Sequence, residues 1–77
     1  MEWAKMTPRE VSSWVKSIGL PDCARAFIVN DISGEYLSVL TERHLQEFGI
    51  SSVGHRLLLI DRIGRLIRGE NVPPVSL

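Results

Sequence analysis

The 77-residue sequence has a single cysteine, Cys23, only two lysines and no long apolar run. One cysteine excludes an internal disulfide and is typical of an intracellular protein. No apolar stretch approaches the ~20 residues that cross a bilayer, and Glu2 and Lys5 interrupt the start, where a signal peptide would be apolar. We therefore expect a cytoplasmic or nuclear location and no membrane contact.

The sequence also lacks the usual patterns of catalytic, cofactor and metal sites. It has no glycine-rich phosphate loop, no Cys-x-x-Cys or His-x3-His spacing and no pair of candidate catalytic carboxylates. Cys23 could pair with His44 or His55 as a nucleophile and its base. It falls at an apolar helical position beside Ala26 and Phe27, however, which favours a buried structural thiol. We expect no enzyme activity, no cofactor and no metal ion.

Capping residues, glycines and apolar spacing indicate a series of short helices. Residues 7–10, Thr-Pro-Arg-Glu, form a capping box with proline at the first helical position. Apolar residues then recur at helical spacing until Gly19, which ends the first helix. A second helix opens around Pro21, with Asp22 as its expected N-cap. This punctuation favours an all-helical domain.

Three more helices are expected in the second half of the chain. They cover residues 34–39, residues 42–48 after the cap Thr41, and residues 53–68 before the terminating Gly69. The core-facing stripe of the last helix is predicted to contain Val53, Leu57, Ile60, Gly64 and Ile67, widened by Leu59, Ile63 and Leu66. The predicted fold is a compact five-helix bundle over residues 1–69, with residues 70–77 as a flexible tail or linker.

The charges are unevenly distributed although the net charge is zero. Residues 22–47 hold five acidic side chains against two arginines, whereas residues 54–69 hold four arginines against one aspartate. An acidic middle and a basic end can offer complementary patches to another protein. The same charges can also be an ordinary solvated surface, because exposed ion pairs contribute little.

The ordered set of motifs resembles the sterile alpha motif (SAM) domain, over about residues 3–68. The matching segments are Trp14-Val15, Ile18-Gly19-Leu20, Phe27, Ile32-Ser33-Gly34, Leu37, Leu40-Thr41, Leu45, Phe48-Gly49-Ile50 and Gly54-His55-Arg56. Two positions depart from the family pattern. Cys23 stands where the family commonly has tyrosine, and Ser33 replaces the usual aspartate of Ile-Asp-Gly, which removes one acidic charge.

The resemblance implies a protein–protein interaction module of a signalling or scaffolding protein. SAM domains commonly associate through a central, often acidic surface and an unlike, often basic surface at the start of the last helix. The implied acidic surface contains Asp31, Glu35 and Glu42, and the implied basic surface contains Gly54, His55, Arg56 and Arg62. The implied partner is another SAM domain, of the same or a different protein, or another protein.

RNA binding is the alternative, because some SAM domains bind RNA hairpins through basic residues around the last helix. The zero net charge and the scarcity of lysine disfavour nucleic acid, since strong phosphate binding requires a broad basic patch. The loss of the aspartate at position 33 favours a foreign partner over self-association. The sequence leaves the partner open, as well as the choice between monomer, dimer and polymer.

Overall fold

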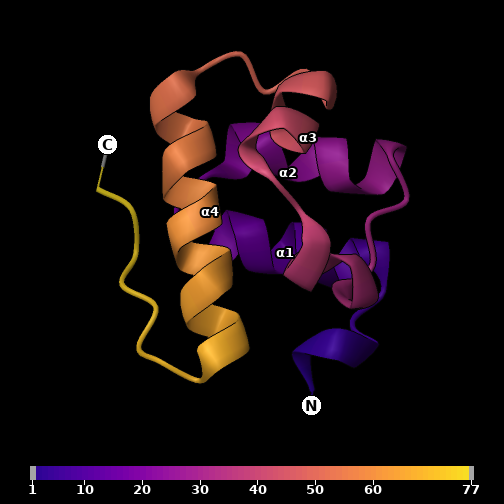
Figure 1. Ribbon diagram of the computed structural model, residues 1–77, viewed down its shortest axis with the longest axis vertical. Helices are drawn as coiled ribbons and strands as arrows, with labels where there is room; N and C mark the ends of the chain where they lie inside the picture. Colours follow the sequence, from indigo (N-terminus) through magenta and orange to yellow (C-terminus); the bar gives the residue numbers. More distant parts are fainter. Residues whose placement is uncertain (1, 77) are drawn as a thin grey trace.

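In the computed structural model, residues 2–76 are described, and their regular structure is entirely helical (Figure 1). The elements are η1 (Trp3–Lys5), α1 (Pro8–Ser17), α2 (Pro21–Val29), η2 (Gly34–Val39), α3 (Glu42–Glu47) and α4 (Val53–Arg68), where η denotes a 3-10 helix. The predicted all-α fold is confirmed, and η1 is an additional turn. Met1 and Leu77, the outer ends of the predicted domain and tail, lie outside the described residues.

Local capping chemistry sets where these helices begin and end. The Thr7 hydroxyl accepts from the Glu10 N–H at 3.2 Å, and the Glu10 carboxylate accepts from the Thr7 N–H at 2.9 Å. This reciprocal pair is the predicted capping box. At the other end of the chain, Gly69 has a φ of 72°, which closes α4 in the left-handed conformation that glycine tolerates.

The predicted cap of α2 is wrong, and the cap of α3 contains an unexpected partner. Leu20, rather than Asp22, is the N-cap of α2, because Pro21 occupies the first helical position and its ring presets the helical φ. In α3, Thr41 caps as predicted, and the Nδ1 atom of His44 accepts from the Thr41 N–H at 3.0 Å. His44 thereby takes the place that Glu or Gln usually fills in a capping box.

The buried side chains of residues 2–76 form one core. Phe27 of α2 and Phe48, which ends α3, meet edge to face with ring centroids 6.0 Å apart. The buried apolar residues are Val11, Val15, Ile18, Leu20, Cys23, Ala24, Phe27, Leu37, Leu45, Ile50, Leu59 and Ile63. Every helix from α1 to α4 therefore contributes to a shared apolar interior.

The face that α4 turns to this core differs from the predicted stripe. Leu59 and Ile63 are buried, whereas Val53 and Leu57 are 57% and 58% exposed. Residues 57–60 are all apolar and point in four directions around a helix, so they cannot all face one core. The core contact falls on the side of Leu59, which places Leu57 on the outside.

The long helix α4 runs along one side of the molecule, and α1 and α2 lie across it (Figure 1). The turn η1 packs on η2, where the Gly34 N–H donates to the Met6 carbonyl at 2.8 Å. A Cβ at Gly34 would lie 1.8 Å from the Trp3 carbonyl oxygen, so only glycine permits this contact. None of the helices in residues 2–76 is long and apolar enough to cross a bilayer.

Residues 70–76 have no regular secondary structure, and they turn back beside α4 (Figure 1). The flexibility predicted for this segment stays a prediction. Its position is nevertheless defined by contacts with the bundle, because Val72 and Val75 pack partly buried against the core.

Candidate functional site

The first turn of α4 forms an exposed apolar surface, which we call the helix-start surface and define as Val53, Gly54 and Leu57. Gly49, with a φ of 92°, ends α3, and the Ser52 hydroxyl starts α4 by accepting from the His55 N–H at 3.2 Å. Val53 and Leu57 are one turn apart on the same side of the helix. A Cβ at Gly54 would meet nothing closer than the Ser52 hydroxyl at 3.9 Å, so the surface is open to a partner.

Arg56, a predicted docking residue, has a buried side chain that links neighbouring segments of the chain by hydrogen bonds. It is only 6% exposed, and its Nε donates to the Glu42 carboxylate at 2.7 Å. Its Nη1 donates to the carbonyls of Ile50 at 2.7 Å and Ser51 at 3.1 Å. The guanidinium therefore ties the start of α3 and the α3–α4 loop to α4. Arg56 and Glu42, which the resemblance assigns to two unlike surfaces, are thus paired with each other within the chain.

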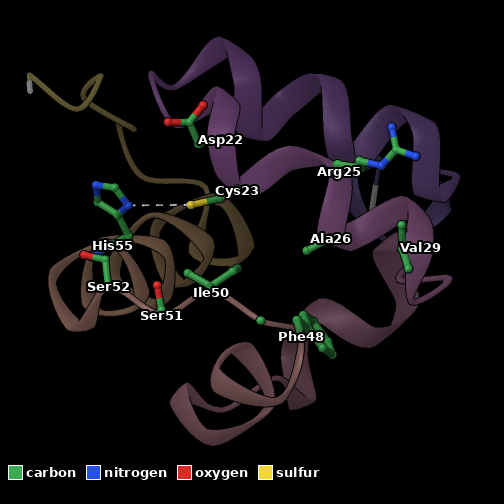
Figure 2. Close-up of a pocket in the computed structure, with 11 residues that line it drawn as sticks. Asp22, Cys23, Arg25, Ala26, Val29, Phe48, Ile50, Ser51, Ser52 and His55 are labelled. Atoms are coloured by element: carbon green, nitrogen blue, oxygen red, sulfur yellow. Dashed lines mark hydrogen bonds between the residues drawn. The ribbon is translucent and has the colours of Figure 1, made fainter.

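His55 is half-buried, and its ring points towards Cys23 of α2 (Figure 2). The Cys23 sulfur and the His55 Nδ1 are 3.9 Å apart, at the edge of a hollow of about 430 Å³ between α2 and residues 48–55. Burial, and then the charge of Asp22, raise the pKa of the Cys23 thiol. A raised pKa keeps the thiol protonated and unreactive, which disfavours a nucleophile–base pair.

Arg62, the other predicted basic residue, lies away from the helix-start surface. It follows Leu57 by five residues, which is about 7.5 Å along the axis and about 140° around it. Its Nη1 donates to the Asp61 carboxylate at 2.6 Å and its Nε to the Pro73 carbonyl at 2.8 Å, leaving the side chain 14% exposed.

The remaining arginines of α4 are paired as well. Arg65 shares the carboxylate of Asp61 at 3.0 Å, and Arg68 meets Glu70 at 2.8 Å. Hydrogen bonds from Arg62, and then from Arg65, lower the pKa of Asp61, and a hydrogen bond from Arg68 lowers the pKa of Glu70. All four arginines of α4 therefore have an ion-pair partner in the same chain, and the predicted basic end is much less positive than its sequence indicates.

The predicted acidic residues Asp31 and Glu35 are exposed, and neither has an ion-pair partner within residues 2–76. Asp31 has a φ of 57° in the turn before η2, and Glu35 lies in the first turn of η2. Beside them, Tyr36 and Val39 are 46% and 64% exposed. We call this region the η2 surface and define it as Asp31, Glu35, Tyr36 and Val39.

An apolar hollow of about 200 Å³ opens at the η2 surface. Its lining residues are Ile32, Tyr36, Val39, Leu40, His44 and Phe48. Neither this hollow nor the exposure of Leu57 is predicted from the sequence. The available signal was the run of four apolar residues at 57–60, of which some must face outward. Within residues 2–76, no group of three His, Cys, Asp or Glu side chains could hold a metal ion.

The fold, with short helices packed on one long last helix, and the two exposed surfaces at η2 and at the start of α4 define a small helical interaction domain. The family model of the SAM domain (sterile alpha motif) matches residues 6–67. The chain belongs to the sterile alpha motif family, and it is a protein-interaction module.

Several characterised proteins contain a similar segment. The chain is 35% identical over 75 residues to the mitogen-activated protein kinase adapter protein MST50 of Pyricularia oryzae, a match of 97% of this chain and 15% of that protein. It is 32% identical over 62 residues to protein bicaudal C of Drosophila melanogaster, covering 80% of this chain and 7% of that protein.

A human relative shows a shorter match. The SH3 and multiple ankyrin repeat domains protein 2 of Homo sapiens is 35% identical over 51 residues, covering 66% of this chain and 3% of that protein. The chain thus spans at most about a sixth of the length of these relatives. No solved structure gave a significant match.

Proposed function

We propose that this SAM domain binds a second SAM domain head to tail, with the helix-start surface of one domain on the η2 surface of the other. The observation that carries the proposal is the exposure of large apolar side chains at two unlike places. Leu57 is 58% exposed at the start of α4, and Val39 is 64% exposed on η2, beside the apolar hollow.

The proposed contact brings exposed apolar side chains to an apolar hollow and a helix N-terminus to two carboxylates. Full burial of a leucine or valine side chain contributes about 1.5–3 kcal/mol, so Val53 and Leu57 in the hollow would supply much of the binding energy. The N-terminal end of α4 carries a partial positive charge and unpaired N–H groups. Asp31 and Glu35 provide carboxylates for that end, and Gly54 allows the partner backbone to approach closely.

The predicted site residues divide into two groups under this proposal. Gly54, His55, Asp31 and Glu35 stay in the proposed contact, with His55 at its edge. Arg56, Glu42 and Arg62 have structural partners within the chain, so we assign them to the stability of the fold. The proposed contact is therefore more apolar and less electrostatic than the sequence indicates.

An unlike pair of surfaces makes a specific prediction about assembly. Head-to-tail contacts generate open chains or closed rings, because a domain bound through one surface still has its other, unlike surface free for the next domain. We expect Leu57→Asp and Val39→Asp each to stop growth, since each places a charge in the apolar contact. A mixture of the two variants still has one intact pair of surfaces, and it should form dimers of one variant on the other.

Sedimentation velocity over a concentration series tests this, with Val29→Asp as the matched control. Val29 is an equally exposed valine, 68% accessible on α2 outside both surfaces, and its change should leave assembly unaltered. Loss of one leucine contact should weaken binding roughly 10- to 100-fold. If the unaltered chain stays monomeric, the partner is a foreign SAM domain, and its binding must be lost in one of the two variants. Binding that survives both variants contradicts the proposal.

The similarity to the fungal kinase adapter protein supports a non-catalytic role in a signalling assembly. A cytoplasmic location stays a prediction. RNA-hairpin binding, the alternative that the sequence allows, has no supporting observation, because all four arginines of α4 are paired with carboxylates of the same chain, Arg62 and Arg65 sharing that of Asp61.

A further inference from the structure

The C-terminal segment follows a defined path over the bundle. After Gly69 the chain reverses and runs back beside α4 (Figure 1). Along this path Val75 reaches the end of α1, where its N–H donates to the Ile18 carbonyl at 2.7 Å. Because Ile18 is the C-cap of α1, its carbonyl has no partner in that helix, and Val75 satisfies it. We call residues 71–75 the strap.

The strap is held by its backbone at alternate residues. The Arg62 Nε donates to the Pro73 carbonyl at 2.8 Å, and the Arg65 Nη1 makes a weak contact of 3.5 Å with the Asn71 carbonyl. Val72 and Val75 pack partly buried against the core. Such a combination of main-chain hydrogen bonds and apolar side-chain contacts is how proteins bind extended peptides.

The bundle side of this contact is shaped for a passing backbone. A Cβ at Gly19 would lie 2.6 Å from the Val75 carbonyl oxygen, so a side chain there would displace the strap. On α4, Asp61 accepts from both Arg62 and Arg65 and thereby fixes the two donors. These features belong to residues 18–65, within the segment that matches the family model, whereas the strap lies outside that segment.

We propose that the surface formed by Ile18, Gly19, Arg62 and Arg65 is a binding site for an extended, proline-containing apolar peptide, and that the strap of the same chain occupies it. Pro73 and Pro74 restrict the strap to extended conformations, so little conformational entropy is lost on docking. Because proline has no backbone N–H, Pro73 and Pro74 also add no donor that needs a partner. A short connection gives the strap an effective concentration in the millimolar range, which favours it over a peptide from another molecule.

Amide hydrogen exchange of the unaltered chain is the first test. The Val75 amide should exchange at least roughly tenfold more slowly than the Ser76 amide, because only a docked strap protects it. In Arg62→Gln the Val75 protection should fall, whereas in Arg68→Gln it should not, since Arg68 pairs with Glu70 and makes no strap contact. Equal exchange at Val75 and Ser76 in the unaltered chain would overturn the proposal.

The second test measures peptide binding by an unlatched chain, which we define as a variant whose strap is released from the bundle. The variant Val72→Asp with Val75→Asp should release the strap, because two charges cannot pack on the core. In a nuclear magnetic resonance titration, a synthetic peptide of residues 69–77 should then bind this variant but not the unaltered chain. Adding Arg62→Gln should abolish that binding, and adding Arg68→Gln should not.

Two further outcomes, one for each test, would contradict the proposal. An unlatched chain that keeps its helical circular dichroism and does not bind the peptide has no such site. Val75 protection that depends on protein concentration would place the strap on a second copy rather than on its own chain. If the unlatched variant loses its helical signal, the exchange comparison between Arg62→Gln and Arg68→Gln decides alone.

Discussion

The first turn of α4 and the rest of that helix differ in which types of residue they bury and which they expose. In the first turn, the apolar side chains of Val53 and Leu57 are on the surface, while the charged side chain of Arg56 is buried. Further along, Leu59 and Ile63 are buried, and the remaining arginines form ion pairs, with the Arg62 side chain 14% exposed and that of Arg68 57% exposed. Residue type alone therefore does not tell which part of this helix binds a partner.

This difference shows that charged side chains can be paired within the chain and are then unavailable to a binding partner. Arg56 is paired with Glu42 and donates to two carbonyl groups, and Arg62 is paired with Asp61 and donates to the Pro73 carbonyl of the strap. A carboxylate partner from outside would have to displace these contacts. Exposed apolar side chains have no such internal partner, so they are the residues available for binding.

The sharpest test of the comparison uses two leucines two residues apart on α4. Leu59→Ala should lower the free energy of unfolding by about 2–5 kcal/mol, because Leu59 is fully buried and its loss leaves a cavity. Leu57→Ala should change it by less than about 0.5 kcal/mol, since Leu57 is largely exposed. Urea denaturation of both variants measures the difference. Similar losses for the two would mean that Leu57 belongs to the core.

Arg56 gives the next largest expected effect. Arg56→Met keeps most of the side-chain volume but leaves the Ile50 and Ser51 carbonyls and the Glu42 carboxylate without their donor. We expect a loss of about 2–4 kcal/mol in the free energy of unfolding. Chemical denaturation, with helical circular dichroism as the signal, checks this.

The matched control for Arg56 is Arg68→Met in the last turn of α4. Arg68 also forms an ion pair, but its side chain is 57% exposed, so its removal should have a far smaller effect. A stable Arg56→Met variant that has lost partner binding would restore Arg56 to the docking surface and break the comparison.

The sequence predicts the helices of this domain better than their faces. Helix ends are set by local chemistry, such as the capping box at Thr7 and the left-handed Gly69, and these predictions hold. The Asp22 cap is wrong because Pro21 next to it already fixes the first turn. Local rules suffice wherever a boundary depends on residues within one turn of each other.

The burial of Arg56 could not be predicted in this way. Its carboxylate partner Glu42 lies 14 residues upstream, and the Ile50 and Ser51 carbonyls converge only once the α3–α4 loop has folded. The strap is a similar case, because Val75 meets Ile18 across most of the chain. Contacts of this kind depend on tertiary packing, which the spacing of residues in the sequence does not contain.

The smallest expected effect concerns Asp61, which holds the outer arginines of α4. Hydrogen bonds from Arg62 and Arg65 lower the pKa of its carboxyl below the ordinary value of about 3.9. A lowered pKa in the folded state means that Asp61 stabilises the fold at neutral pH, and that this contribution is lost as the pH falls through its folded pKa. Asp61→Asn should therefore be slightly less stable than the unaltered chain at pH 7, and the difference should shrink in acid.

Thermal unfolding between pH 7 and pH 2 measures this difference, and 1 M salt provides the control. Because Asp61 is exposed, salt should screen its ion pairs and reduce the difference at neutral pH. A difference that persists in high salt would mean that Asp61 acts through the hydrogen-bond geometry it gives Arg62, and hence through the strap, rather than through its charge. The result thus separates two roles of the outer arginines: electrostatic pairing along α4, and the positioning of a donor for the chain's own C-terminal segment.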